Sequence, residues 1–300
     1  MKRREFLRTT GAAAVGLSSL PVGWATGAEK KQSEKKQRVL YYTRSAGYEH
    51  SAVRRENGQL SHSEKVLIEM GKKAGFEVVC SKDGRVFDGD LDQYDALAFY
   101  SCGNQLAVGK RPENPPMTAT GKQRLLEAIA AGKGYVGFHS AADTFHSGKE
   151  IDPYVAMVGG EFMGHGTPQD VPMLLESPKF PGTGGLDKSF KVGKEEWYAF
   201  RNFSKDLRVI LAQDTEAMSK KHPRDKLLYS RPAFPATWAR MQGKGRVFYT
   251  SMGHFHEVWT HPTFQQIVLG GFAWAMRNVD ADVTPNVEKV TPGAWQLKAE

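Results

Sequence analysis

The fold is decided by one stretch of the chain, which consists of VLYYT at 39–43, SEKVLIEMGKKA at 63–74, Gly75, and FEVVC at 76–80. The two outer pieces are short apolar runs of the kind that buried strands have, rich in β-branched and aromatic residues. The middle piece carries apolar residues at helical spacing, with Ser63 as its expected N-cap and the glycine as its expected end. Strand, helix and strand in this order predict two parallel strands joined by a crossover helix.

The same rhythm continues along the chain. Tyr94–Tyr100 is a third apolar run, Thr120–Ala131 is an amphipathic pattern that stops at Gly132, and Tyr135–Phe138 is a fourth run. We therefore expect an α/β fold built on a doubly wound, mainly parallel sheet. Residues 150–235 are rich in proline and glycine, and they predict an irregular, β-containing insertion that extends the sheet or forms its edge.

The last part of the chain predicts a hairpin and a helix. Ala236–Gln242 and Arg246–Ser251 are two strand-like runs separated by Gly243-Lys244-Gly245, a combination typical of a hairpin turn. Phe264–Arg277 predicts the last helix. The tail from Asp280 onward contains proline and threonine, and we expect it to be loosely ordered.

The N-terminus has the pattern of a twin-arginine export signal. Arg3 and Arg4 precede a mildly apolar run at 11–20, and the small residues at 26–28 suit a signal-peptidase site. The run is about half as long as a membrane-spanning helix requires, and no cysteine lies near enough for a lipid anchor. We expect residues 1–28 to direct the folded protein through the twin-arginine export machinery to the periplasm or beyond, without a stable membrane anchor.

The basic composition does not indicate a nucleic-acid partner. Of the formal net charge of +8, six charges lie in the signal and in the stretch 29–38, which predicts a solvated, charged linker. The remaining net charge of +2 on the globular part is too small to indicate a nucleic-acid-binding surface. The sequence lacks the glycine-rich phosphate loops of dinucleotide and ATP sites, so we expect no nucleotide cofactor. Cys80 and Cys102 are too few for a disulfide framework.

Four histidines follow strand-like runs, namely His50, His139, His165 and His254. Ligands of parallel α/β sheets bind at the carboxyl ends of the strands, so we expect at least three of these imidazoles to converge on one site. Imidazole is suited both to metal ligation and to proton transfer near neutral pH. We predict His139 and His254 as catalytic residues, with His254 as general base and His139 orienting it or the substrate. Alternatively, His139, His165 and His254 hold a divalent transition metal, zinc or manganese.

The sequence around His139 also allows other assignments of the site residues. Gly137–Ala142 is built like the strand-to-turn junction of a nucleophile elbow, which makes Ser140 a candidate nucleophile, although the Gly-x-Ser-x-Gly pattern is absent. His139 could also be a strand-end histidine that is hydrogen bonded to backbone. Asp143 or Glu257 could supply the carboxylate that orients an imidazole or completes a metal site.

Aromatic residues crowd the same segments of the sequence. Aromatic rings beside polar groups suit the apolar faces of sugars. We predict the substrate-binding residues to be His50 at the rim of the site, together with Tyr48, Ser140, Trp197 and Tyr198.

Several segments resemble the ThuA-like (trehalose utilisation) family, and together they run over residues 38–278. They are Tyr48-Glu49-His50, Gly137-Phe138-His139, Gly159–Phe162 with His165, Glu195-Glu196-Trp197-Tyr198 and, most specifically, Gly243–His254. The resemblance implies the flavodoxin-like sheet of class I glutamine amidotransferases, with a ThuA-like domain at 39–278 and a tail at 279–300. Amidotransferases carry a cysteine nucleophile where this chain has His139, and His254 matches their later histidine. Cys102 lies at the end of a different strand, so the resemblance does not imply glutamine hydrolysis.

The resemblance also implies a role in carbohydrate metabolism, associated with disaccharide use and 3-keto-sugar intermediates. We therefore expect an exported protein that cleaves or rearranges a glycoside or 3-keto-glycoside, as a hydrolase or lyase. The alternative is a non-catalytic carbohydrate-binding or accessory protein that uses an aromatic-lined pocket.

Overall fold

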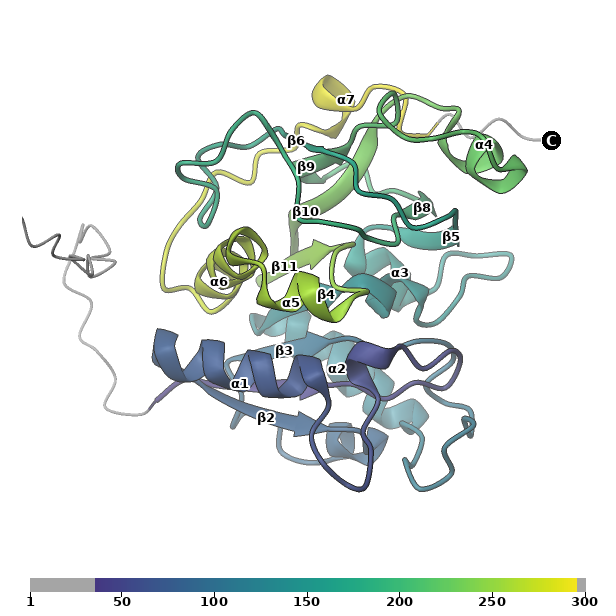
Figure 1. Cartoon of the computed structure of the whole chain (residues 1–300). Helices are drawn as coiled ribbons and strands as arrows, with labels where there is room; N and C mark the ends of the chain where they lie inside the picture. Colours follow the sequence, from purple (N-terminus) through teal and green to yellow (C-terminus); the bar gives the residue numbers. More distant parts are fainter. Residues whose placement is uncertain (1–35, 296–300) are drawn as a thin grey trace, which may run out of the picture. The chain divides into compact units, whose positions relative to one another are not determined.

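A mixed sheet organises residues 36–295, which are the part of the chain that the computed structural model describes (Figure 1). Its strand order is β2-β1-β3-β4-β11-β10-β9-β6-β7, and β5 pairs with β8 in a separate small sheet. The strands are β1 (Arg38–Tyr42), β2 (Glu77–Ser81), β3 (Ala96–Phe99), β4 (Gly134–Phe138), β5 (Glu161–His165), β6 (Met173–Leu175), β7 (Ser189–Phe190), β8 (Tyr198–Arg201), β9 (Arg208–Gln213), β10 (Phe234–Gln242) and β11 (Gly245–Thr250).

The first half of the sheet is parallel, as the sequence predicts. β2, β1, β3, β4 and β11 are joined by parallel ladders, and this order is the flavodoxin-like one when these strands are numbered along the chain. Every residue of β3 and β4 is buried. Strands covered on both faces read as continuous apolar runs, which is why these segments could be identified without alternation.

The helices lie on both faces of the sheet (Figure 1). On one face α1, α5 and α6 contact one another, and on the other face α2 contacts α3. The α-helices are α1 (His62–Ala74), α2 (Ala119–Ala131), α3 (Pro153–Val158), α4 (Pro223–Tyr229), α5 (His256–Thr260), α6 (Pro262–Ala275) and α7 (Val287–Val290). Three short 3₁₀ turns are η1 (Ser51–Val53), η2 (Gly84–Asp88) and η3 (His139–Asp143).

The N-cap of α1 is Ser61, so the prediction of Ser63 was wrong. The Ser61 hydroxyl accepts a hydrogen bond from the backbone N–H of Glu64 at 3.4 Å, and the Glu64 carboxylate accepts one from the Ser61 N–H at 2.8 Å. This reciprocal capping box satisfies two backbone donors at once. The C-terminal end was predicted correctly, because Gly75 adopts a left-handed conformation with φ of 92°.

The predicted insertion extends the sheet on its antiparallel side. β9 pairs with β10, and β6 then joins β9 and β7, all antiparallel. The hairpin of β10 and β11 is also as predicted, with Gln242 paired to Gly245 across the turn. β5 and β8 form their own antiparallel pair, which brings the segments around His165 and Tyr198 together.

The C-terminal segment is packed against the sheet, so the expectation of a loosely ordered tail was wrong for residues 280–295. Val287, Thr291 and Ala294 are buried. The Asn286 side chain accepts a hydrogen bond from the Val209 N–H at 2.6 Å and donates one to the Val209 carbonyl at 3.1 Å. Proline and threonine disfavour regular secondary structure in this segment. They do not prevent the Asn286 side chain from forming hydrogen bonds with the backbone of β9.

We expect Asn286→Ala to lower the free energy of unfolding by about 2 kcal/mol, because it removes both of these partly buried hydrogen bonds. For a chain of this size that corresponds to a decrease in Tm of roughly 5 °C in a thermal melt. Asn278→Ala is the control, since the Asn278 side chain only contacts Gln37 at an exposed position. Equal melting of the two variants would show that the segment does not stabilise the sheet.

The predicted export signal, and most of the predicted linker, lie outside the described residues. Within residues 36–295, no helix combines the length and the apolar character that crossing a bilayer requires.

Candidate functional site

The candidate site lies at the carboxyl ends of the parallel strands β1, β4 and β11. His50 follows β1 and caps η1, His139 comes directly after β4, and His254 lies four residues beyond the end of β11. Glu196 joins them from the segment that precedes β8. Segments more than 200 residues apart in the sequence thus meet at the sheet edge where α/β proteins bind ligands.

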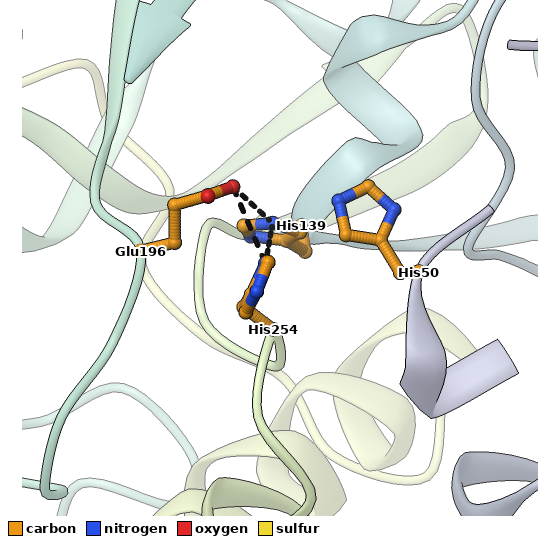
Figure 2. A group of neighbouring side chains, drawn as sticks. All are labelled: His50, His139, Glu196 and His254. Atoms are coloured by element: carbon orange, nitrogen blue, oxygen red, sulfur yellow. Dashed lines mark hydrogen bonds and ion pairs between the residues drawn. The ribbon is translucent and has the colours of Figure 1, made fainter. Parts of the chain in front are cut away.

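Four donor atoms, one each from His50, His139, Glu196 and His254, lie within 4.8 Å of one another. His254 Nδ1 is 3.2 Å from His139 Nε2 and 3.2 Å from Glu196 Oε2, while His139 Nε2 is 3.5 Å from the same carboxylate oxygen. Figure 2 shows His50 on the other side of His139 from Glu196, with one ring nitrogen turned toward the other residues. We call these four residues the histidine–glutamate cluster.

His139 is held in one orientation by the backbone around it. Its Nδ1–H donates to the Ser251 carbonyl at 2.7 Å, and the Tyr249 hydroxyl donates to the His139 carbonyl at 2.7 Å. Its φ of 40° is left-handed, which is uncommon for a residue with a side chain. Because burial lowers the pKa of His139, the ring is neutral near pH 7, and its Nε2 lone pair faces the cluster.

The pKa values of His50 and Glu196 are also shifted by their surroundings. Burial, reinforced by the neighbouring imidazoles, lowers the pKa of His50 well below its usual value. Burial alone would raise the pKa of Glu196, but its contacts with His139 and His254 outweigh burial and hold that pKa far below the usual range. Near pH 7 the cluster therefore presents the neutral imidazoles of His50 and His139 and the carboxylate of Glu196. His50 Nδ1 is buried and has no hydrogen-bond partner among the described residues.

His165 lies beside the cluster and contacts it through Glu196. Its Nδ1 is 3.1 Å from Glu196 Oε1, the oxygen that points away from His254, and the side chain is partly exposed. The predicted convergence of at least three of the four histidines is therefore observed, with His50, His139 and His254 in the cluster. The predicted ligand set differs, since His50 rather than His165 completes the four donor atoms.

The predicted substrate-binding residues occupy different positions. Tyr48 is 63% exposed and packs edge-on against His50. His50 itself is buried, so its predicted position at the rim was wrong. Tyr198 is buried, and its ring lies 4.0 Å from that of His139. Ser140 is buried, and its hydroxyl has no hydrogen-bond partner within the described part of the chain.

Trp197 does not present a surface to a sugar. It is fully buried, and its indole N–H donates to the Gln169 carbonyl at 3.0 Å. The reason is strand alternation, since neighbouring residues at the start of β8 point to opposite sides and Tyr198 takes the side of the site. The predicted stacking role of Trp197 is thus incompatible with its packing.

Glu196 is the functional residue that sequence reasoning missed. The two carboxylates considered instead lie elsewhere, because Asp143 contacts His146 at 2.6 Å and Glu257 is exposed on α5. The available signal was the Glu-Glu-Trp-Tyr segment, which resembled the family and whose Trp197 and Tyr198 were predicted to bind substrate, but whose two glutamates were not assigned a role. Which carboxylate reaches the histidines depends on how β8 pairs with β5, and the sequence does not reveal this pairing.

Glu195 positions two members of the cluster through their backbone. Its carboxylate accepts hydrogen bonds from the N–H groups of Gly253 at 2.7 Å, Glu196 at 2.8 Å and His254 at 3.1 Å. Burial raises its pKa to about 7, although these donors act in the opposite direction. One buried side chain thus ties the loop that carries His254 to the segment that carries Glu196.

We expect Glu195→Ala to lower the free energy of unfolding by at least about 3 kcal/mol, because it leaves three backbone donors without their acceptor. Glu127→Ala on the exposed face of α2 is the control. A thermal melt measures both, and equal Tm values for the two variants would contradict a clamping role for Glu195.

The donor atoms of the cluster fit a transition-metal ion. Ligand atoms about 2.1 Å from a tetrahedral ion are separated from one another by about 3.4 Å, and the three measured separations are 3.2, 3.2 and 3.5 Å. The bond from His139 Nδ1–H to the Ser251 carbonyl is the outer-shell contact typical of metal-binding histidines. His50, His139, His254 and Glu196 are the residues that could hold the ion.

The comparisons with known proteins agree with the fold. One solved structure is a ThuA-like protein from Bacteroides uniformis ATCC 8492, with 19% identity, coverage of 83% of this chain and 95% of that chain, and a TM-score of 0.57. Another is a ThuA-like protein from Parabacteroides merdae ATCC 43184, with 17% identity, coverage of 83% and 92%, and a TM-score of 0.60. Identities this low show a shared fold and say nothing of activity.

Comparison with curated protein sequences gives no match. The family model described as "Trehalose utilisation" (ThuA) matches residues 38–275, which include every residue of the histidine–glutamate cluster. A match over most of the chain shows that this protein belongs to the ThuA, or trehalose utilisation, family.

Proposed function

We propose that this protein is an exported enzyme of carbohydrate metabolism that cleaves or rearranges a glycoside, of the 3-keto type, at the histidine–glutamate cluster. The observation that carries the proposal is the convergence of three imidazoles and one carboxylate at the ligand-binding edge of the sheet. The link of the ThuA family to trehalose utilisation supports a sugar as substrate.

The surroundings of each residue in the cluster suggest a different role for it in the reaction. His139 is fixed by Ser251 and Tyr249, so it serves as a rigid orienting group. His254 is partly exposed and has its Nδ1 between His139 and Glu196, which suits a group that meets the substrate. The buried ring of Tyr198 packs on His139 and helps to hold it in place. A zinc or manganese ion, when bound here, would polarise a keto-sugar carbonyl or acidify a water molecule.

The first test combines elemental analysis with an assay on glycosides and 3-keto-glycosides. The mature protein, beginning at Glu29, is purified beside His254→Ala and the control Glu257→Gln, which alters an exposed carboxylate three residues away. We expect one transition-metal ion per chain and turnover of a keto-glycoside in the wild type and the control, and neither in His254→Ala. Saturable sugar binding without turnover in all three proteins would instead favour the accessory, carbohydrate-binding function.

Export is tested separately from catalysis. We expect the double substitution of Arg3 and Arg4 by lysine to keep the protein in the cytoplasm, because the twin-arginine machinery reads the arginine pair. Cell fractionation followed by immunodetection measures the distribution of the full chain. Unchanged export of the double variant would contradict this route.

A further inference from the structure

A pocket lies between the two segments that follow His50 and His254 in the sequence. η1 begins directly after His50, α5 begins two residues after His254, and the rings of these two histidines are 5.2 Å apart. The pocket between the segments has a volume of about 260 Å³ and is also lined by the first turn of α1. Pockets for whole small molecules start at roughly 300 Å³, so this one has room for a single functional group of a ligand.

The lining of this pocket is rich in nitrogen-bearing side chains. Arg54, His62, Lys65 and His256 line it, against one carboxylate from Glu56. The rings of His62 and His256 are stacked at 4.4 Å and 5°, with His62 Nε2 3.1 Å from the His256 carbonyl. The N-terminal end of α1, which carries the positive end of the helix dipole, faces the same space.

Among the residues that line the pocket, the side chains of Arg54 and Lys65 face a single carboxylate, that of Glu56. Glu49 is shared by Lys82 at 3.3 Å, Arg111 at 3.2 Å and Arg54 at 3.7 Å, so Arg54 has the longest contact of the three. Among the described residues, Lys65 makes no ion pair. Arg54 thus shares the Glu49 carboxylate with two cations that lie outside the pocket lining, and Lys65 is the lining cation left to meet an anion.

We propose that this pocket binds an anionic group of the substrate, a carboxylate or a phosphate carried by the sugar. The inference rests on the proposed function and adds to it that the substrate is an acidic sugar, with its anionic group between Arg54 and Lys65 and its reacting carbon at the histidine–glutamate cluster. Arginine offers paired N–H donors to a planar carboxylate or a phosphate, and lysine adds a point charge.

Isothermal titration calorimetry at constant ionic strength tests the pocket. The probes are inorganic phosphate, glucose, glucuronate and glucose 6-phosphate, which separate a phosphate from a carboxylate and both from a neutral sugar. The variant is Arg54→Gln with Lys65→Gln. The control is Lys72→Gln with Lys73→Gln, which removes the same charge from exposed positions at the other end of α1.

We expect inorganic phosphate and at least one of the acidic sugars to bind the wild type and the control. The pocket variant should bind them at least about tenfold more weakly, since a hydrogen bond to a charged group contributes about 1.5–3 kcal/mol. Glucose should bind all three proteins alike. Equal affinity of the wild type and the pocket variant for the anions, or absence of anion binding by the wild type, would overturn the inference.

The same titration with His254→Ala separates this inference from the proposed function. Phosphate binding should be retained in His254→Ala, because His254 does not line the pocket. If turnover of sugars is absent while phosphate binding depends on Arg54 and Lys65, the proposed function is contradicted and the inference of an anion-binding pocket is supported. If turnover depends on His254 but anions bind no better than glucose, the reaction stands and the pocket fails.

Discussion

Replacing His254 by alanine is expected to lower kcat/KM for the sugar substrate by at least about a thousandfold, as the loss of a principal acid–base group does. The His254 imidazole contacts both His139 and Glu196, so its removal breaks two of the three measured contacts of the cluster. The side chain is 17% exposed and lies on a loop. Its loss therefore opens the site to water rather than leaving a cavity in the core, and we expect the fold to be retained.

Steady-state kinetics and a thermal melt measure this prediction together. The matched control is His222→Ala, which removes an exposed imidazole at the start of α4 that is not a member of the cluster. We expect the control to keep the wild-type kcat/KM. Wild-type activity in His254→Ala, or an equal loss in both variants, would contradict the assignment of the site.

Removal of a bound metal ion is expected to have the largest effect on stability. An ion that binds only the folded chain at a free concentration a thousandfold above its Kd adds about 4 kcal/mol to the free energy of unfolding. In a chain of this size a chelator should therefore lower Tm by roughly 10 °C. Without the ion, the carboxylate of Glu196 and the lone pairs of neutral imidazoles such as His139 Nε2 face one another at short range, which adds to the loss.

The chelator experiment also decides between metal and acid–base chemistry at this site. His254→Ala should show almost no change of Tm with chelator, because it has lost one donor of the four. Re-addition of zinc or manganese should restore the wild-type Tm and leave the variant unchanged. A wild-type Tm that does not respond to chelator or to either ion would favour the alternative in which His254 is the general base and His139 orients it.

The sequence determined the parallel half of the fold. The apolar runs of β1, β3 and β4 are continuous because both faces of these strands are covered, and the helices between them end at glycines such as Gly75 and Gly132. These are local signals, and local signals can be read without knowing any neighbour. The hairpin of β10 and β11 is of the same kind, since its turn lies between strands that are adjacent in the sequence.

The sequence also predicted that at least three of the four histidines meet, although not that His50 rather than His165 is the third member. A residue that follows a parallel strand lies at the carboxyl edge of the sheet wherever that strand lies, which is why histidines from distant strands could be expected to approach one another. The clustering therefore follows from strand direction alone, and it holds although His50 and His254 are 204 positions apart.

Only the tertiary structure decided which groups complete the site. Glu196 was selected over Asp143 and Glu257 because β8 pairs with β5 and places this carboxylate against His139 and His254. The same pairing buries Trp197 and turns Tyr198 toward the cluster. Pairing between distant strands depends on packing across the whole sheet, and a side-chain period of two means that a shift by one residue exchanges the two faces. The sequence by itself fixes the edge at which the chemistry occurs, whereas long-range packing fixes the carboxylate and the rings that face it.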